Sequence, residues 1–405
     1  MVVDAVRGAA VLCMIQWHCA DAWIGGPIRD GGFFNITRIV GGLAAPLFLL
    51  LAGISAALVF RPERVGSGVR RGIEIVVGGY AFKLFAWSVD YGALVDRQNW
   101  LAIALDAALL LVLWRAANEA TRAPRRAVLV GLAIFLWTAT WLALSGTTRT
   151  PMLVWRLDVL QGIGAALIVV NGVLYALSRS RHAPFVLALL AIGVALATPS
   201  FVGVDLSWLP TRVVDYIART TSDPAMSLAR FPLFPWLAYT LLGAAVGAHI
   251  RARPLREPWD VPFARNGYVA LGVAILFALC VFEPMPSAQW FLVRSEQPRN
   301  LLRLLWNAAI ATGFAGLSSF TLPFLPLARR IVLSLGRHSL IVYVVHLEIA
   351  FGLPCVPIRQ MLGFGEWAIG TTMLLGAMVA LSFWLDARDT RSRPKAEDAA
   401  ALARA

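Results

Sequence analysis

Apolar segments of about twenty residues recur along the whole chain, and they restrict the possible folds more than any other feature. An α-helix of that length crosses the ~30 Å hydrocarbon core of a membrane. Of the 405 residues, 59% are hydrophobic and only 15% are charged, whereas a soluble domain carries about 25% charge. We therefore predict an all-α fold, a polytopic transmembrane bundle of about 12 helices. The candidate segments are 2–24, 38–60, 72–90, 99–115, 127–145, 153–177, 183–200, 228–250, 264–283, 299–320, 331–352 and 367–386.

The basic residues fall into every second connection between these segments, although the net charge of the chain is +13. Short cytoplasmic loops of membrane proteins are enriched in Lys and Arg, so an even number of helices with both termini cytoplasmic fits the pattern. We expect a multi-pass protein of a bacterial-type inner membrane. Nucleic acid is not an expected partner, because no basic stripe is interleaved with base-stacking aromatics. The basic connections contain Arg61, Arg64, Arg70 and Arg71; Arg115, Arg122, Arg125 and Arg126; Arg179 and Arg181; Arg251, Arg253 and Arg256; Arg329 and Arg330; and Arg388, Arg391, Arg393 and Lys395.

The spacing of the segments favours one continuous transmembrane domain over residues 1–386. Residues 387–405 are rich in alanine and charge, and we predict a disordered cytoplasmic tail. The four cysteines have no C-x-x-C spacing, and Cys13, Cys19 and Cys280 lie in apolar segments. They are interpreted as small buried hydrophobic residues, and no metal site is predicted.

Two opposite charges fall inside candidate membrane segments. Lys83 and Asp106 occupy similar depths in antiparallel neighbours, the third and fourth segments. A lone charge at that depth costs far more than a paired one, so we predict an ion pair between them. The pair is interpreted as structural, and a functional role stays open.

A histidine and a carboxylate mark the outward end of the first segment. Asp21 follows His18 at i+3 and so lies on the same helix face, one turn further out. A carboxylate that orients an imidazole raises its basicity, which a general base requires. The alternative is that His18 is an ordinary packing residue.

The eleventh segment carries a second polar stripe. Ser339, Tyr343 and His346 lie at i, i+4 and i+7, so His346 reaches a depth near that of His18. A further charged pair, Arg156 and Asp158, opens the sixth segment on the outward side. The outward polar cluster that we predict comprises His18, Asp21, Arg156, Asp158 and His346.

Five motifs in order along the chain resemble the heparan-α-glucosaminide N-acetyltransferase family and its bacterial relatives, within the broader membrane acyltransferase superfamily. The human-type enzymes carry a catalytic histidine in the first outward loop, whereas residues 22–37 of this chain contain none. His18 matches instead a histidine that bacterial relatives carry on the first helix. The motifs are Asp4-x-x-Arg7-Gly8 with Met14 and His18; Pro46 through Gly53-x-Ser55; Arg156-x-Asp158 with Gln161-Gly-Ile-Gly164; Phe231-Pro-Leu-Phe-Pro-Trp236 with Gly243; and Leu335-Gly-Arg-x-Ser339 with Tyr343 and His346.

The resemblance implies a membrane acyltransferase that moves an acetyl group from cytosolic acetyl-CoA to an extracytoplasmic acceptor, such as a sugar hydroxyl or amine. Arg7, Arg337 and Ser339 would then bind acyl-CoA, since arginine suits its phosphates. Arg156 and His346 are the candidates for stabilising the oxyanion. The implied partners are the lipid bilayer, acyl-CoA and an envelope glycan or other small acceptor, with a homodimer left open. A transporter or flippase that uses the same charges is the alternative.

Overall fold

The computed structural model describes residues 2–95, 157–201, 230–252 and 300–402, with isolated positions between 201 and 230. Side chains are described for these residues except 83–95, 300, 302, 353 and 391–402. The predicted all-α class is confirmed in these ranges, which contain helices, turns and isolated β-bridges such as the one between Ile24 and Leu362, but no strand. Three predicted segments, 99–115, 127–145 and 264–283, lie outside the described residues.

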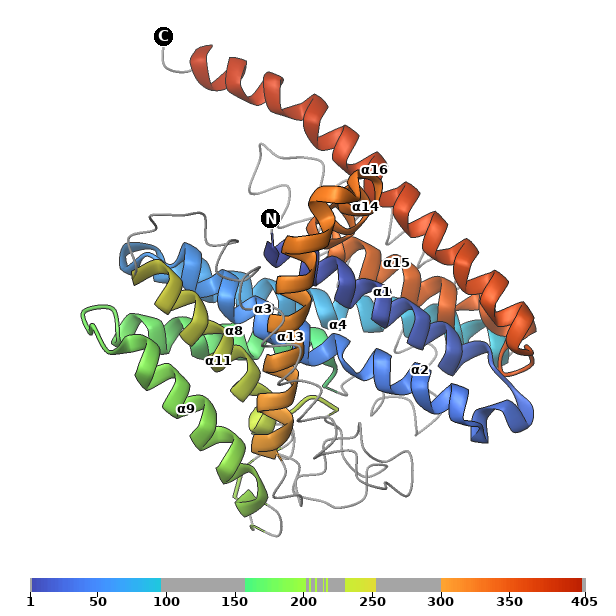
Figure 1. Cartoon of the computed structure of the whole chain (residues 1–405), viewed down its shortest axis with the longest axis horizontal. Coiled ribbons are helices and arrows are strands. Elements are labelled where there is room, and N and C mark those ends of the chain that lie inside the picture. The colour runs from blue at the N-terminus through green and yellow to red at the C-terminus, as the bar shows by residue number, and fades with distance from the viewer. Residues whose placement is uncertain are drawn as a thin grey trace.

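The described α-helices follow the apolar segments closely (Figure 1). They are α1 (Val2–Trp23), α2 (Gly32–Gly42), α3 (Ala44–Val59), α4 (Val65–Val95), α8 (Val159–Ala176), α9 (Ala183–Ala197), α11 (Leu233–Ala252), α13 (Asn300–Thr321), α14 (Pro326–Arg337), α15 (Ser339–Phe351) and α16 (Phe364–Leu402). Short 3₁₀ turns lie between them: η1 (Gly26–Asp30), η2 (Pro62–Arg64), η3 (Thr198–Phe201), η5 (Leu322–Phe324) and η6 (Leu353–Ile358).

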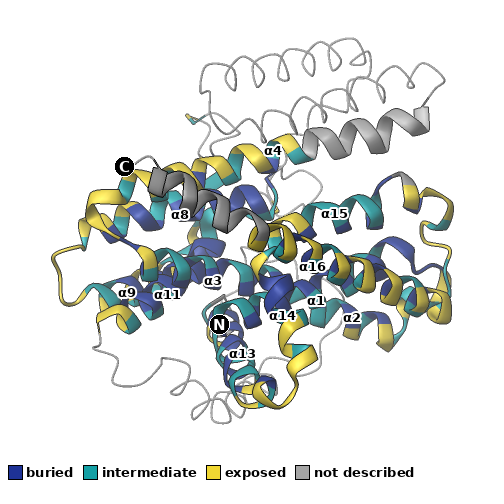
Figure 2. Cartoon of the chain, turned by 90° about the horizontal axis from the view of Figure 1, so that it is seen from above, coloured by how far each residue is buried: buried dark blue, intermediate teal, exposed yellow. Residues whose placement is uncertain are grey.

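The helices form two groups, one built around α3 and the other around α1. On one side α3, α8, α9 and α11 enclose a core that includes Leu49, Val170 and Leu241. On the other side α1 packs with α14, α15 and α16. A third cluster on α1, α3 and α13 joins the two groups. In Figures 1 and 2 the groups lie at opposite sides of the molecule, so that α1 and α3 run through its middle.

Glycines allow the central helices to approach each other at backbone distance. A Cβ atom at Gly53 of α3 would lie 2.0 Å from the Thr240 carbonyl oxygen, and one at Gly243 of α11 would lie 1.9 Å from the Leu50 carbonyl oxygen. Small residues produce such close crossings in membrane bundles, where lipid supplies no hydrophobic drive for helix association. The α3–α11 pair therefore depends on these two positions.

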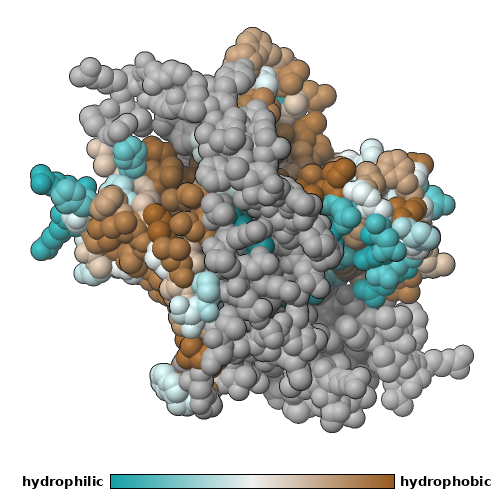
Figure 3. All heavy atoms as spheres, turned by 60° about the horizontal axis from the view of Figure 1, so that its bottom comes forward, coloured by the Kyte–Doolittle hydropathy of each residue, from teal (hydrophilic) through white to brown (hydrophobic). Residues whose placement is uncertain are grey.

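Several described segments are long and apolar enough to cross a membrane. They are Gly32–Val59, Val159–Ala176, Ala183–Phe201, Leu233–Ala252 and Phe364–Thr390, to which α14 and α15 add a sixth if they form one broken span. Large apolar side chains are exposed on their outer faces, among them Phe185, Leu196 and Ile369. Figure 3 shows apolar residues over much of the described surface, with hydrophilic residues gathered towards two opposite ends. This distribution fits a protein embedded in lipid.

The predicted single helix over 331–352 is wrong. The chain forms two helices, α14 and α15, that meet at 86° with His338 at the corner. The Asp386 carboxylate of α16 binds both residues of the corner, at 2.9 Å from Arg337 and 3.1 Å from His338. Apolar periodicity did not reveal the break because the stabilising carboxylate is distant in sequence.

The last helix extends beyond the predicted domain end. α16 continues to Leu402, past residue 386 where the apolar pattern stops. The division into a domain over 1–386 and a disordered tail over 387–405 stays a prediction, as do the count of twelve helices and the cytoplasmic location of both termini.

Candidate functional site

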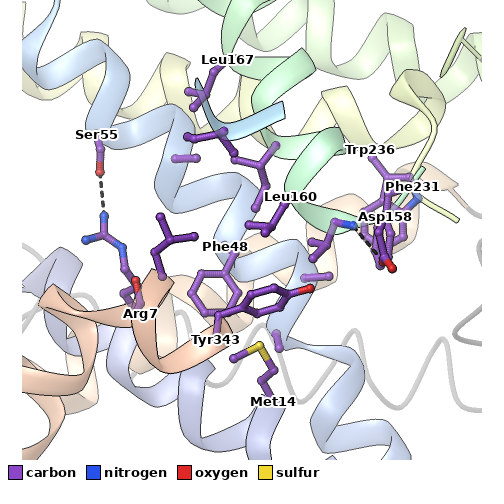
Figure 4. A pocket seen from close by; sticks show the side chains of 18 of the residues that line it. Arg7, Met14, Phe48, Ser55, Asp158, Leu160, Leu167, Phe231, Trp236 and Tyr343 are labelled. Carbon is purple, nitrogen blue, oxygen red and sulfur yellow. Dashed lines mark hydrogen bonds between the residues drawn. The ribbon is translucent and has the colours of Figure 1, made fainter. Parts of the chain in front are cut away.

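A cavity of about 1570 Å³ lies between the two helix groups. Its lining comes from α1, α2, α3, α4, α8, α11, α14 and α15 and from the turns η1 and η2. Figure 4 shows that it is elongated: Arg7 and Ser55 lie at one end, Asp158, Phe231 and Trp236 at the other, and Phe48 and Tyr343 between them. The cavity therefore joins two regions of different chemistry.

One end of the cavity is rich in arginine. The Arg7 guanidinium donates to the Asp4 carboxylate and to the Ser55 hydroxyl, each at 3.1 Å, which fixes its position on the cavity wall. Arg337 and Ser339 from the α14–α15 corner line the same cavity, and their predicted role in binding acyl-CoA stays a prediction. A cluster of guanidinium groups is the chemistry that binds phosphates. The other arginines of the lining at this end are Arg61, Arg64, Arg71 and Arg251.

A pair of histidines lies at the opposite end. The Nδ1 atom of His18 is 2.8 Å from the Nε2 atom of His346, although the two residues are 328 positions apart. Their planes are within 6° of parallel, and a centroid separation of 5.1 Å places the rings edge to edge. His346 is fully buried, and its Nδ1 atom is 2.8 Å from the Val342 carbonyl oxygen one turn earlier on α15. His18 lines the cavity.

Asp21 does not orient His18, which corrects the prediction from their i+3 spacing. Its carboxylate accepts a hydrogen bond at 3.2 Å from Arg29, which also donates to the backbone carbonyls of Asp21 and Ile24. The η1 turn brings Arg29 back over the end of α1. The Asp21 carboxylate therefore binds the charged Arg29 guanidinium, which is a stronger hydrogen-bond partner than the His18 ring. Asp21 still lines the cavity, and a catalytic role for it stays a prediction.

A hydrogen-bond partner faces each ring nitrogen of His346, the residue for which the sequence predicts an oxyanion role. One ring nitrogen of His346 faces a carbonyl and the other faces His18. With both nitrogens engaged, the ring has no donor left for a developing oxyanion. In this geometry the His346 ring contacts His18 and its own helix, and an oxyanion role for it stays a prediction.

Asp158 caps the helix that borders the histidine end. Its carboxylate accepts a hydrogen bond from the Val159 N–H at 3.0 Å, and the Gln161 side chain accepts one from the Asp158 N–H at 3.2 Å. This capping box fixes the start of α8. Asp158 also lies close enough to His18 and Tyr343 to interact with them electrostatically.

Comparison with protein families decides the class of the protein. The model of the catalytic region of heparan-alpha-glucosaminide N-acetyltransferase matches residues 1–103 and 104–277, more than half of the chain. The chain belongs to this family. The resemblance drawn from the five motifs is thereby confirmed, and the protein is a transferase of the membrane N-acetyltransferase class. No curated protein matches the chain.

The N-acetyltransferase match covers only part of the cavity wall. Arg7, His18 and Asp158 of the wall fall within the matched residues, whereas Arg337 of the wall and the buried His346 behind it lie beyond residue 277. The histidine pair therefore joins a residue of the matched region to one outside it.

Three arginines that line the cavity are not among the site residues predicted from the sequence. Arg29, Arg38 and Arg230 line the cavity at its histidine end. Arg29 and Arg230 lie in turn-rich connections that contain few basic residues, and a basic residue in such a connection was the signal available. Two predicted features lie outside the described residues: Arg156, and the ion pair of the Lys83 side chain with Asp106.

Proposed function

We propose that the protein transfers an acetyl group from cytosolic acetyl-CoA to an amine or hydroxyl group of a sugar on the outer face of the membrane. The observation that carries the proposal is a single cavity with arginines at one end and a histidine pair at the other. A donor and an acceptor that enter from opposite sides can meet only in a cavity of this kind.

The donor end fits coenzyme A. Arg7, anchored by Asp4 and Ser55, would bind a phosphate together with the neighbouring arginines of the cytoplasmic loops. Arg7 and His18 are separated along α1 by about 16 Å at 1.5 Å per residue. The long, narrow pantetheine arm of CoA spans such a distance, so its thioester would lie near the histidine pair.

The acceptor end fits acid–base catalysis. His18 would accept the proton of the attacking amine or hydroxyl while that group adds to the thioester carbonyl carbon. Collapse of the tetrahedral species breaks the C–S bond, and the departing CoA sulfur takes the proton back from His18. An acetyl-histidine intermediate uses the same residue as nucleophile and leaves the overall balance unchanged.

Vectorial acetyl transfer is the decisive test. Purified protein would be reconstituted into vesicles with radiolabelled acetyl-CoA outside and a simple α-glucosaminide trapped inside. We expect labelled N-acetyl product in the lumen, and none in vesicles without protein. Movement of acetyl-CoA or sugar without consumption of the thioester would contradict the proposal and favour a transporter.

Replacement of Arg7 by glutamine is expected to raise the KM for acetyl-CoA by about tenfold or more, because a charge-assisted hydrogen bond contributes about 1.5–3 kcal/mol. Initial rates at varied acetyl-CoA would measure the change. The matched control is Arg181→Gln, which removes an exposed loop arginine that does not line the cavity. An Arg7→Gln protein with the wild-type KM would exclude Arg7 from donor binding.

A further inference from the structure

We infer that His346 is a positioning residue, which holds His18 in the tautomer that has its proton on Nδ1 and its lone pair on Nε2. This inference rests on the proposed acetyl transfer, because it assigns the reacting atom of that reaction. It follows from counting protons along three groups: the Val342 carbonyl, the His346 ring and the His18 ring.

The count starts at a group that can only accept. A backbone carbonyl has no proton to give, so the 2.8 Å contact between Val342 and His346 requires a proton on Nδ1 of His346. A neutral imidazole carries one N–H, which leaves Nε2 of His346 as an acceptor. His346 thus presents a lone pair to its neighbour.

The tautomer of His18 follows directly. Its Nδ1 atom lies 2.8 Å from the Nε2 atom of His346. Because that Nε2 atom carries a lone pair and no proton, His18 must supply the proton of the hydrogen bond. The near-parallel, edge-to-edge rings place this hydrogen bond in the plane of both imidazoles, where the lone pair lies. With the Nδ1 proton committed, Nε2 is the nitrogen of His18 that remains basic.

A protonated His346 would reverse the direction of the bond, but the surroundings do not favour a charge there. His346 has no exposed surface, and its ring contacts the backbone of its own helix at Val342 and Tyr343 and the ring of His18. An imidazolium buried without a bonded carboxylate is strongly disfavoured. The charged groups near the pair, Asp158 and Arg230, interact electrostatically with His18.

The arrangement assists both halves of the reaction. Nε2 of His18 takes the acceptor proton as the new bond to the acetyl carbon forms, which converts His18 to an imidazolium. Its Nδ1–H then donates a stronger, charge-assisted bond to His346. Nε2 returns the proton to the CoA sulfur when the C–S bond breaks, and His18 is again neutral.

Two variants of similar size separate positioning from packing. His346→Gln places a carbonyl oxygen, an acceptor for the His18 N–H, in the space of the ring, whereas His346→Leu fills that space without an acceptor. We expect His346→Leu to lower kcat by about tenfold or more, with the KM for acetyl-CoA unchanged, and His346→Gln to recover most of that loss. Equal rates for the two variants, or full activity of His346→Leu, would overturn the assignment.

A spectroscopic readout tests the tautomer without any activity assay. The chain has five histidines, so ¹⁵N-histidine labelling gives few signals, and His18→Ala identifies those of His18. We expect a protonated Nδ1 and an unprotonated Nε2 for His18 in the folded wild-type protein, and a loss of this preference in His346→Leu. A proton on Nε2 in the wild-type protein would overturn the inference.

The two experiments distinguish the inference from the function on which it rests. If the vesicles show acetyl transfer but the Leu and Gln variants behave alike, the positioning role fails and the proposed function stands. If no transfer occurs while the ¹⁵N signals show the expected tautomer, the proposed function fails and the proton arrangement at His18 stands.

Discussion

Replacing His18 by alanine is expected to lower the rate of acetyl transfer by about a hundredfold to ten-thousandfold, the contribution of a general acid–base group. His18 is the member of the histidine pair that lines the cavity, and its neighbour His346 is fully buried. The loss should appear in kcat, because His18 lies near Asp158, which is at the end of the cavity opposite Arg7 in Figure 4, and would not contact the phosphates of the donor.

The matched control for this substitution is His182→Ala. His182 is exposed at the start of α9 and lies outside the cavity, so its replacement should leave the rate unchanged. Acetyl-CoA binding, measured by equilibrium titration of the purified protein, should be retained by His18→Ala. Full transfer activity in that variant would show that another group acts as the base.

The largest effect on stability is expected for Gly243→Ala. A Cβ atom at this position would lie 1.9 Å from the Leu50 carbonyl oxygen and 2.8 Å from its carbon, and backbone atoms of α3 cannot rotate away as a flexible side chain would. α3 and α11 must move apart, and this also breaks the reciprocal close contact between Gly53 and Thr240. We expect a loss of about 3 kcal/mol or more in the free energy of unfolding, at the upper end of overpacking effects.

Gly172→Ala is the matched control, since it is the same substitution on another membrane helix. A Cβ atom at Gly172 of α8 meets nothing within 4 Å, so the variant should be neutral or more stable by about 0.5–1 kcal/mol. Thermal unfolding in detergent, followed by the fraction of monodisperse protein, would compare the two. Equal stability of the two variants would mean that α3 and α11 do not cross as closely as described.

Local pattern predicted the helices well because each apolar segment is a continuous stretch of sequence. The runs at 2–24 and 183–200 match α1 and α9 to within a few residues. Helical spacing likewise put Tyr343 and His346 on one face, and their rings do lie in contact, with centroids 5.8 Å apart. The break at His338 was missed, because Asp386, which binds the corner, is 48 residues away.

The amino-acid sequence by itself determined that the protein is helical and rich in membrane-length segments, that His18 and His346 reach similar depths, and which family the chain belongs to. These follow from segment length, helical periodicity and local motifs. Only the tertiary structure decided the partners of the polar groups: Asp21 with Arg29, and His18 with His346. A hydrogen bond depends on distances and directions between side chains from different segments, and no spacing within one segment specifies them.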